Sequence, residues 1–432
     1  MSGIQISDTG TQLTRGKTIR NVAVIGAGIV GVSSAIWLQR LGHRVVLIDR
    51  EGPAAGTSYG NAGVLAACAV VPVTVPGLVA KAPKMLFSAD APLFLKWAYA
   101  LKLLPWLGKY LKHCNPADVR RIAAALTPIL ADSLLQHEAL AADSKAAAFI
   151  KPTDYLFVYD DRKAFDAEKF VWDVRRENGF DWQELDFDEL TARDPGFRDG
   201  SARFGVSLGQ HGFIADPGRY VKALAEHFVA GGGEMFVGTV EDLTASNGQV
   251  VRVETSNGPV ECDTAIMATG VWSEALSRKI GVRVPMEAER GYHVEFYNPT
   301  QMPRFPSMIS SGKFVATPMN GRLRCAGIVE FGGLTALASK KPLELLKRKV
   351  HEVFPDMSYE RTEEWLGHRP APSDSIPLIG EFDRMGRVYA GFGHQHVGLT
   401  GGAKTGRILA DLVSGIEPSI DMAPYRPDRF TH

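Results

Sequence analysis

Residues 21–49 read NVAVIGAGIVGVSSAIWLQRLGHRVVLID. The first five residues and the run VVLI at 45–48 are rich in β-branched side chains, which is typical of buried strands. Residues 32–41 between them favour a helix, which Gly42 ends. The stretch therefore predicts a strand, a turn, a helix and a second strand, with the acid Asp49 at the end of the second strand.

The turn, Gly26-Ala27-Gly28-Ile29-Val30-Gly31, has the spacing G-x-G-x-x-G. Its first glycine permits a tight turn, its second lets a pyrophosphate approach the backbone, and its third lets the helix pack closely on the sheet. The helix N-terminus adds free N–H groups that attract phosphates. Asp49 is placed to accept a hydrogen bond from a ribose 2′-OH, and its charge disfavours the 2′-phosphate of NADP. We expect a dinucleotide site here rather than a turn without a ligand.

Length and composition limit the remaining possibilities. A chain of 432 residues allows two or three domains, and 48 basic against 48 acidic residues argue against nucleic-acid binding. Residues 1–20 are polar and predict a flexible leader, and no run of 18 apolar residues predicts a transmembrane helix. The cysteines lie far apart without a C-x-x-C pair, which predicts neither a disulfide framework nor a metal site: Cys68, Cys114, Cys262 and Cys325.

Three further segments favour FAD over NAD as the dinucleotide. Residues 56–63, GTSYGNAG, form a polar glycine-rich loop that suits an extended ribityl-pyrophosphate. Residues 233–270 read as three strands joined by Asn247-Gly248 and Asn257-Gly258, an antiparallel meander that interrupts a parallel sheet. Near the end, a strand at 388–392, the loop GHQHVGLT and a helix at 401–413 place a helix N-terminus where it can face a reduced flavin ring.

Taken together, these features resemble the glycine and D-amino-acid oxidase superfamily of FAD oxidoreductases, over nearly the whole chain. The landmarks that carry the resemblance are the glycine turn with Asp49, Ser58 with Asn61-Ala62-Gly63, Ala268-Thr269-Gly270-Val271-Trp272, Arg290-Gly291-Tyr292, Gly367-His368-Arg369-Pro370 with Asp374 and Pro377-Leu378-Ile379-Gly380, and Gly393-His394. A long insertion at 81–113 makes the chain most similar to the bacterial D-amino-acid dehydrogenases.

The resemblance implies an α/β fold in which two domains interleave. A Rossmann-like FAD-binding domain, a parallel sheet with the antiparallel meander, takes residues 21–63, 200–281 and 367–432. An α+β substrate-binding domain takes 64–199 and 282–366. Its sheet is expected to include 291–297, 313–318 and 323–329, and its clearest helix spans 340–354.

The resemblance also implies noncovalent FAD, because neither Cys325 nor a motif-matched position supports covalent attachment. Val240 corresponds to the place where relatives contact adenine through the backbone. The expected cofactor-binding residues are Gly26, Ala27, Gly28, Ile29, Val30, Gly31, Asp49, Arg50, Ser58, Asn61, Ala62, Gly63, Val240, Ala268, Gly270, Trp272, Gly393, His394, Gly398, Leu399 and Thr400.

The implied reaction is the loss of a hydride from Cα of a neutral amine to flavin N5, followed by hydrolysis of the imine. No acid–base pair is required once the amine is deprotonated, so positioning supplies much of the catalysis. Arg369 matches the family arginine that binds the substrate carboxylate, for which its planar fork is suited; the alternative is a structural ion pair with a residue such as Asp374. Tyr292 either adds a hydroxyl to that carboxylate or is a strand tyrosine.

His394 and His396 either line the amine side of the pocket or only shape the loop. The second histidine stands where D-alanine-type dehydrogenases have smaller residues. This difference favours cyclic imino acids, such as D-proline or cis-4-hydroxy-D-proline, as substrates.

The insertion at 81–113 contains six lysines and one acid, interleaved with Trp, Tyr and Leu, and Pro83, Pro92 and Pro105 are expected to break it into short helices. Such a segment suits an anionic membrane surface, and it equally suits a helical cap over the substrate pocket. With membrane contact we expect a quinone or another respiratory acceptor, and a cytoplasmic protein peripheral on the inner face of the membrane.

Two other functions remain open. A 2-hydroxy-acid dehydrogenase on the same fold would use Arg369 as well, with His394 or His396 as the base that a hydroxyl requires. A catalytically silent flavin-binding or dinucleotide-binding subunit of a larger oxidoreductase has the same fold.

Overall fold

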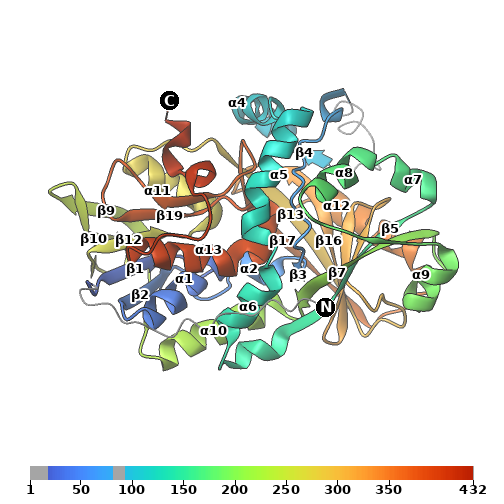
Figure 1. The fold of residues 1–432 in the computed structure, drawn as a ribbon, viewed down its shortest axis with the longest axis horizontal. Coiled ribbons are helices and arrows are strands. Elements are labelled where there is room, and N and C mark those ends of the chain that lie inside the picture. Colours follow the sequence, from blue (N-terminus) through green and yellow to red (C-terminus); the bar gives the residue numbers. More distant parts are fainter. Residues whose placement is uncertain (1–17, 81–92, 432) are drawn as a thin grey trace, which may run out of the picture.

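The computed structural model describes residues 18–80 and 93–431, so most of the predicted leader and residues 81–92 of the insertion lie outside the described part. Two halves lie side by side (Figure 1). One half is built on a six-stranded sheet with the order β18-β19-β12-β1-β2-β8, and the other on a sheet with the order β17-β13-β16-β15-β14-β5-β7-β3. β4 pairs with β16 and β6 pairs with β7 to complete the second sheet.

The six-stranded sheet is parallel except at its edge strand β18, which is antiparallel to β19. Its strands come from three separate parts of the chain, as the resemblance implied. They are β1 (Asn21–Ile25), β2 (Arg44–Asp49), β8 (Glu234–Val237), β12 (Thr264–Met267), β18 (Leu378–Glu381) and β19 (Val388–Phe392).

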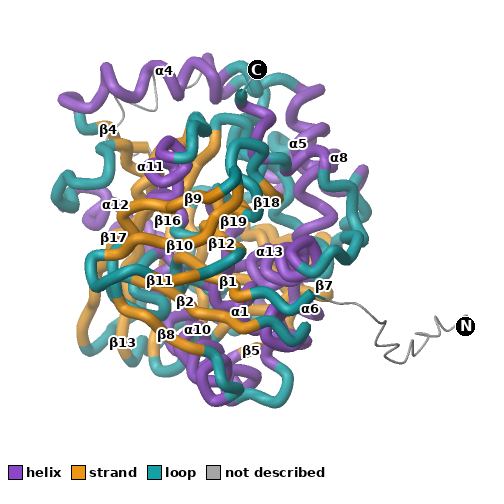
Figure 2. The backbone as a smooth tube through the Cα atoms, turned by 90° about the vertical axis from the view of Figure 1, so that its left-hand side faces the viewer, coloured by secondary structure: helices purple, strands orange, loops and turns teal. Residues whose placement is uncertain are grey.

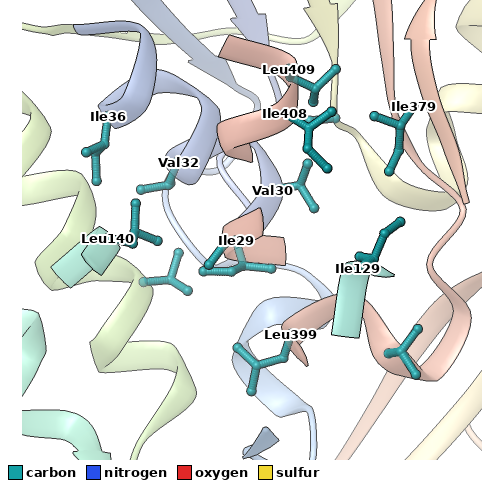
Figure 3. Packing of buried hydrophobic residues seen from close by; sticks show 14 of the residues in the cluster. Ile29, Val30, Val32, Ile36, Ile129, Leu140, Ile379, Leu399, Ile408 and Leu409 are labelled. Carbon is teal, nitrogen blue, oxygen red and sulfur yellow. The ribbon is translucent and has the colours of Figure 1, made fainter. Parts of the chain in front are cut away.

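Helices α1 (Ile29–Arg40) and α13 (Gly398–Val413) pack on each other beside this sheet, and Figure 3 shows the apolar core between them. Their backbones approach so closely that a Cβ at Gly406 would overlap Ser33. Both helices begin at a glycine loop after a parallel strand, so their N-termini lie at the same edge of the sheet, where ligands bind in folds of this kind.

The predicted meander is confirmed. β9 (Val240–Ser246), β10 (Gln249–Thr255) and β11 (Val260–Glu261) pair antiparallel in a sheet of their own. Asn247 and Gly248, at the first turn, both have positive φ, of 50° and 75°, which the twist of a two-residue hairpin requires.

The second sheet has a long antiparallel centre in which β13 pairs with β17 on one side and β16 on the other. Its strands are β3 (Val64–Leu65), β4 (Leu93–Leu95), β5 (Ile150–Tyr159), β6 (Gln183–Leu185), β7 (Phe204–Ile214), β13 (Met286–Tyr297), β14 (Ser307–Ile309), β15 (Phe314–Met319), β16 (Arg322–Phe331) and β17 (Arg361–Pro372). The strands predicted at 291–297 and 323–329 lie within β13 and β16, and the strand predicted at 313–318 overlaps β15, which begins one residue later.

The remaining helices cover the faces and ends of the two sheets (Figures 1 and 2). They are α2 (Thr57–Gly60), α4 (Ala100–Leu111), α5 (Pro116–Leu130), α6 (Ser133–Ala141), α7 (Arg162–Asp166), α8 (Lys169–Glu177), α9 (Phe187–Arg193), α10 (Pro217–Ala230), α11 (Ser273–Lys279) and α12 (Lys340–Val353). No helix in 18–80 or 93–431 is long and apolar enough to cross a membrane.

Two details differ from the sequence-based expectations. β7 pairs along its length with β5, so it belongs to the second sheet although residues 200–281 were assigned to the FAD-binding domain. Pro105 lies inside α4 and does not break it. The carbonyl of Leu101, which Pro105 leaves without a helical donor, lies at the exposed face of the helix, where water can bind it.

Candidate active site

A cavity of about 1030 Å³ runs between the two halves. One end is lined by the glycine turn, Asp49 and Val240. The other end is lined by Arg369, His394 and His396. Both halves therefore contribute residues to the lining of one cavity.

The glycine turn has the geometry that its sequence predicts. Gly26 has φ +105°, and a Cβ there would lie 2.6 Å from the carbonyl oxygen of Ala268. A Cβ at Gly31 would overlap the carbonyl oxygen of Gly26. Gly28 lines the cavity, so its missing side chain leaves room for a pyrophosphate.

Asp49 has a second task that the sequence did not reveal. Its carboxylate accepts hydrogen bonds from the backbone N–H groups of Ala27 at 2.8 Å, and of Glu51 and Gly52 at 2.9 Å each. These bonds hold the glycine turn to the end of β2. Two carboxylate oxygens offer about four lone-pair sites, so one remains for a ribose hydroxyl.

The polar loop at 56–63 is bound to the helix that follows the glycine turn. The Ser58 hydroxyl accepts a hydrogen bond from the N–H of Ile29 at 2.9 Å. Asn61 closes its own turn by donating to the carbonyl of Ser58 and accepting from the N–H of Gly63, which has φ +78°. Ser58, Asn61 and Ala62 line the cavity.

The other predicted cofactor residues surround the same space. Arg50 lies over the ring of Trp272, with 4.2 Å between its guanidinium carbon and the ring centroid. In the last loop, Gly393 turns with φ +88°, and the Thr400 hydroxyl donates to the carbonyl of Val64. The cavity lining also includes Val240, Ala268, Gly270, Gly398 and Leu399.

These residues fit FAD. The N–H groups of Val30 and Gly31, in the first turn of α1, bind no residue that the structure describes and are directed toward the place of the pyrophosphate. The N-terminus of α13 faces the same cavity from its far end. Cys325 packs in the core of the second half and does not line the cavity, so it offers no point of attachment for the flavin.

Arg369 is the central residue at the far end of the cavity. It lines the cavity from β17, and its guanidinium lies where a Cβ on Gly291 would be. It makes no hydrogen bond or ion pair with any described residue, whereas Asp374, the proposed structural partner, pairs with Arg429 at 2.8 Å. An enclosed cation open to a cavity is suited to bind an anionic group of a ligand.

The hydroxyl of Tyr292 is not available to bind substrate, contrary to one of the two expectations. Its side chain is 1% exposed, and its hydroxyl donates to Glu330 at 2.7 Å and accepts from the N–H of Ser339 at 2.9 Å. A phenol has one donor hydrogen, so none is left for a substrate carboxylate. The geometry matches the strand tyrosine that was the alternative.

The two histidines of the last loop differ in their surroundings. His394 is buried and shares a hydrogen bond of 2.9 Å with Thr405 of α13. His396 lies below the molecular surface, and its ring borders the cavity. Burial lowers the pKa of both to about 4, and the charge of Arg369 adds to the effect at His396. Both are therefore neutral at pH 7, and imidazoles with so low a pKa are weak bases for a substrate proton.

Sequence reasoning missed three residues that line the same end of the cavity: Glu289, Trp365 and Gln395. Trp365 stacks on His293 and lies against Gly60 and Gly367. Gln395 has φ +46°, and its buried amide nitrogen has no partner among the described residues. Glu289 could have been noticed in the sequence, because Glu287 and Glu289 alternate along a strand whose other residues are mostly buried.

Comparisons with known proteins match nearly the whole chain. The DAO family, described as FAD dependent oxidoreductase, matches residues 21–412. The D-amino-acid oxidase of Bradyrhizobium diazoefficiens is 40% identical over 418 residues, which cover 95% of this chain and 99% of that protein. A D-amino acid dehydrogenase of Cereibacter sphaeroides is 30% identical over 417 residues, which cover 95% of each chain.

Solved structures show the same fold at low sequence identity. Glycine oxidase from Geobacillus kaustophilus superposes with a TM-score of 0.69 at 20% identity, covering 95% of this chain and 98% of the other. L-proline dehydrogenase from P. horikoshii gives a TM-score of 0.70 at 17% identity, covering 96% and 98%.

Proposed function

The chain belongs to the DAO family of FAD-dependent oxidoreductases, and from this membership we propose that it catalyses the oxidative deamination of D-amino acids. The observation that carries the proposal is Arg369, a cation on the cavity wall that makes no hydrogen bond or ion pair with any described residue. Bound FAD supplies the acceptor for the hydride that leaves Cα.

The chain's own residues position the substrate. Arg369 holds the carboxylate through a two-pronged contact, which fixes the direction of the Cα–H bond. Trp365 and His396 line the same cavity and limit the remaining space. Water hydrolyses the imine product to the keto acid and ammonia.

The substrate panel tests this function. D- and L-amino acids, D-proline, cis-4-hydroxy-D-proline and 2-hydroxy acids are added anaerobically to the purified protein, and the visible flavin absorbance is followed. Bleaching by D-isomers supports the proposal. Bleaching by 2-hydroxy acids alone would replace it, and a flavin that no member of the panel bleaches would favour a catalytically silent subunit.

Among D-amino acids we propose a preference for cyclic imino acids such as D-proline and cis-4-hydroxy-D-proline. The support is His396, whose uncharged ring narrows the cavity near Arg369 and can pack on a compact ring. In the panel, D-proline should reduce the flavin with a higher kcat/KM than D-alanine. The reverse order would contradict this preference.

For the acceptor we propose a quinone, reached at the inner face of the cytoplasmic membrane. α4 lies at the top of the molecule in both views and runs along it in Figure 2 (Figures 1 and 2), and Leu103, Trp106 and Tyr110 are buried on its inner face. Its other face exposes 82% of Leu101 and 56% of Leu104. Exposed lysines flank these leucines, which is the combination that favours an anionic lipid surface: Lys102, Lys109 and Lys112.

Sedimentation with vesicles tests the membrane proposal. We expect vesicles rich in phosphatidylglycerol to bind the wild type and to release the Leu101→Ser, Leu104→Ser double variant, which leaves the buried face of α4 intact. Leu135→Ser, a change at another exposed leucine, is the matched control. Equal binding of all three proteins would remove the membrane surface as a partner. If the enzyme reduces a soluble quinone more slowly than it reduces oxygen, the proposal of a quinone as electron acceptor is wrong.

A further inference from the structure

Glu289 is a buried acid whose carboxyl faces the active-site cavity without a hydrogen-bond partner among the described residues. Its side chain is 5% exposed and lines the cavity, and its carboxyl makes no hydrogen bond or ion pair with any described residue. Its neighbours on the sheet are satisfied: Glu287 accepts from the Tyr99 hydroxyl at 3.0 Å, and Glu330 pairs with Arg290 at 3.2 Å. Buried carboxyl groups are normally paired, so an open one at a cavity indicates a ligand contact.

The register of the second sheet places Glu289 beside Arg369. The two residues are directly opposite each other on β13 and β17, so their side chains share one face of the sheet with about 5 Å between Cβ atoms. The guanidinium extends over Gly291, two residues along β13, and leaves the cavity in front of Glu289 open. In an α-amino acid the ammonium and carboxylate share one carbon, so a group beside the carboxylate anchor meets the ammonium.

Within the described part of the chain, the neighbouring histidines and tyrosines at this end of the cavity are less suited to take a proton at neutral pH. His394 and His396 have pKa values lowered to about 4, and Tyr292 already donates to Glu330. Burial also raises the pKa of the Tyr110 phenol, which faces Glu289 from α4, well above its usual value.

The charges around Glu289 suit a proton acceptor. Burial raises the pKa of Glu289 to about 7; Arg369 on β17 opposes this shift, and Glu287 on the same strand adds to it. Phe331, opposite on β16, carries no charge. A carboxyl with this pKa is ionised in about half of the molecules at pH 7 and can return the proton to water after each turnover.

We propose that Glu289 is the catalytic residue that takes the proton from the substrate ammonium, an inference that rests on the proposed function. In this step an N–H bond breaks and its electron pair stays on nitrogen. The proton forms an O–H bond with the Glu289 carboxylate, which becomes the neutral acid. The free nitrogen lone pair then assists the departure of hydride from Cα.

The test follows anaerobic flavin reduction as a function of pH in Glu289→Gln, with Glu287→Gln as the matched control on the same strand. In the wild type the rate should rise with pH through about 7, since only ionised Glu289 accepts a proton. Glu289→Gln should be slower by roughly 100-fold at pH 7 and should recover as the pH approaches the pKa of the free ammonium. Glu287→Gln should keep the rise of the rate with pH, with its midpoint moved toward lower pH, because the charge of Glu287 adds to the raised pKa of Glu289.

A second measurement separates proton transfer from substrate positioning. Propionate is D-alanine without its amino group, and its binding, followed through the flavin spectrum, should be equal in wild type and Glu289→Gln. If Glu289→Gln does not fold, Glu289→Asp provides the second variant. It keeps a carboxylate and should lower the rate at every pH without removing the rise through neutral pH.

Several results would overturn the inference. A wild-type pH profile and rate in Glu289→Gln would remove Glu289 as the acceptor. Loss of propionate binding in Glu289→Gln would show that Glu289 only positions Arg369. A rate loss confined to amino acids with polar side chains would show that Glu289 binds the substrate side chain instead of the ammonium. If no amino acid reduces the flavin of the wild type, both the proposed function and this inference are wrong. Each of the three results above would overturn only the inference about Glu289.

Discussion

Arg369 is the side chain that we propose binds the substrate carboxylate. It is enclosed by protein, borders the cavity, and makes no hydrogen bond or ion pair with a described residue, although the charge of Glu289 acts on it. The space for its guanidinium exists because position 291 is glycine. The proposed substrate contact therefore depends on a pair, an arginine on β17 and a missing side chain on β13.

We expect Arg369→Ala to raise KM for amino acids at least tenfold and to leave FAD bound, because charge-assisted hydrogen bonds contribute about 1.5–3 kcal/mol each. Arg369→Lys should recover only part of the loss, because an ammonium cannot form the two-pronged contact. Steady-state kinetics and the flavin absorbance of the purified variants measure both effects. An unchanged KM in Arg369→Ala would remove it as the carboxylate anchor.

Gly291→Ala tests the same contact from the other side. The added Cβ would overlap the Arg369 guanidinium, so we expect KM to rise roughly as far as in Arg369→Lys, again with FAD retained. Gly108→Ala is the control, since nothing lies within 4 Å of a Cβ there. If Gly291→Ala binds substrate like the wild type, the arginine has room to move and the glycine is not required.

At the scale of elements, the loop at 56–63 depends on the second sheet for its position. Arg324 on β16 donates to the carbonyls of Tyr59 at 3.1 Å and Asn61 at 2.7 Å. Its neighbour Arg322 binds the same acid, Glu295, but reaches Asp216 at the start of α10 instead of the loop. A strand of one half thus holds a cofactor loop of the other.

We expect Arg324→Met to weaken FAD binding at least tenfold, about 1.4 kcal/mol, because the loop loses two hydrogen bonds from a charged donor. Arg322→Met should lower the melting temperature with a much smaller effect on FAD affinity. Fluorescence titration of the deflavinated proteins with FAD measures the dissociation constants. Equal affinities in the two variants would show that the loop keeps its shape without Arg324.

At the scale of the whole molecule, Glu295 joins the two halves through these arginines. Burial alone would raise its pKa, but Arg324 and Arg322 lower it to about 2. Because the folded pKa is below the unfolded value of about 4.3, the stabilisation is complete above pH 4.3 and is lost as the pH falls toward 2. A shift of this size corresponds to a free energy of unfolding on the order of 3 kcal/mol.

The melting temperature should therefore be higher in the wild type than in Glu295→Gln at pH 7, and the difference should shrink between pH 4.3 and 2. Glu363→Gln, a change at an exposed acid paired with Arg361, should differ little from the wild type at any pH. A difference between the wild type and Glu295→Gln that stays constant down to pH 2 would contradict the lowered pKa.

Part of the fold and of the candidate site could be predicted because its signals are local. Gly26 and Gly31 are required by backbone geometry within one turn, and Asn247-Gly248 specifies a hairpin by its own dihedral angles. The interleaved halves and Arg369 came from the resemblance. The amide contacts of Asp49 and the closed hydroxyl of Tyr292 could not be predicted, since both depend on packing between distant segments.

The sequence by itself determined the dinucleotide turn, the meander and the last strand–loop–helix unit, because each is specified by residues that are close in the chain. Only the tertiary structure decided that Arg369 faces the cavity and forms no ion pair with Asp374. It also decided that Tyr292 binds Glu330 and that Glu289 lies beside Arg369. The physical reason is strand register. It joins positions 80 residues apart, and a shift of one residue would direct each of these side chains to the opposite face of the sheet.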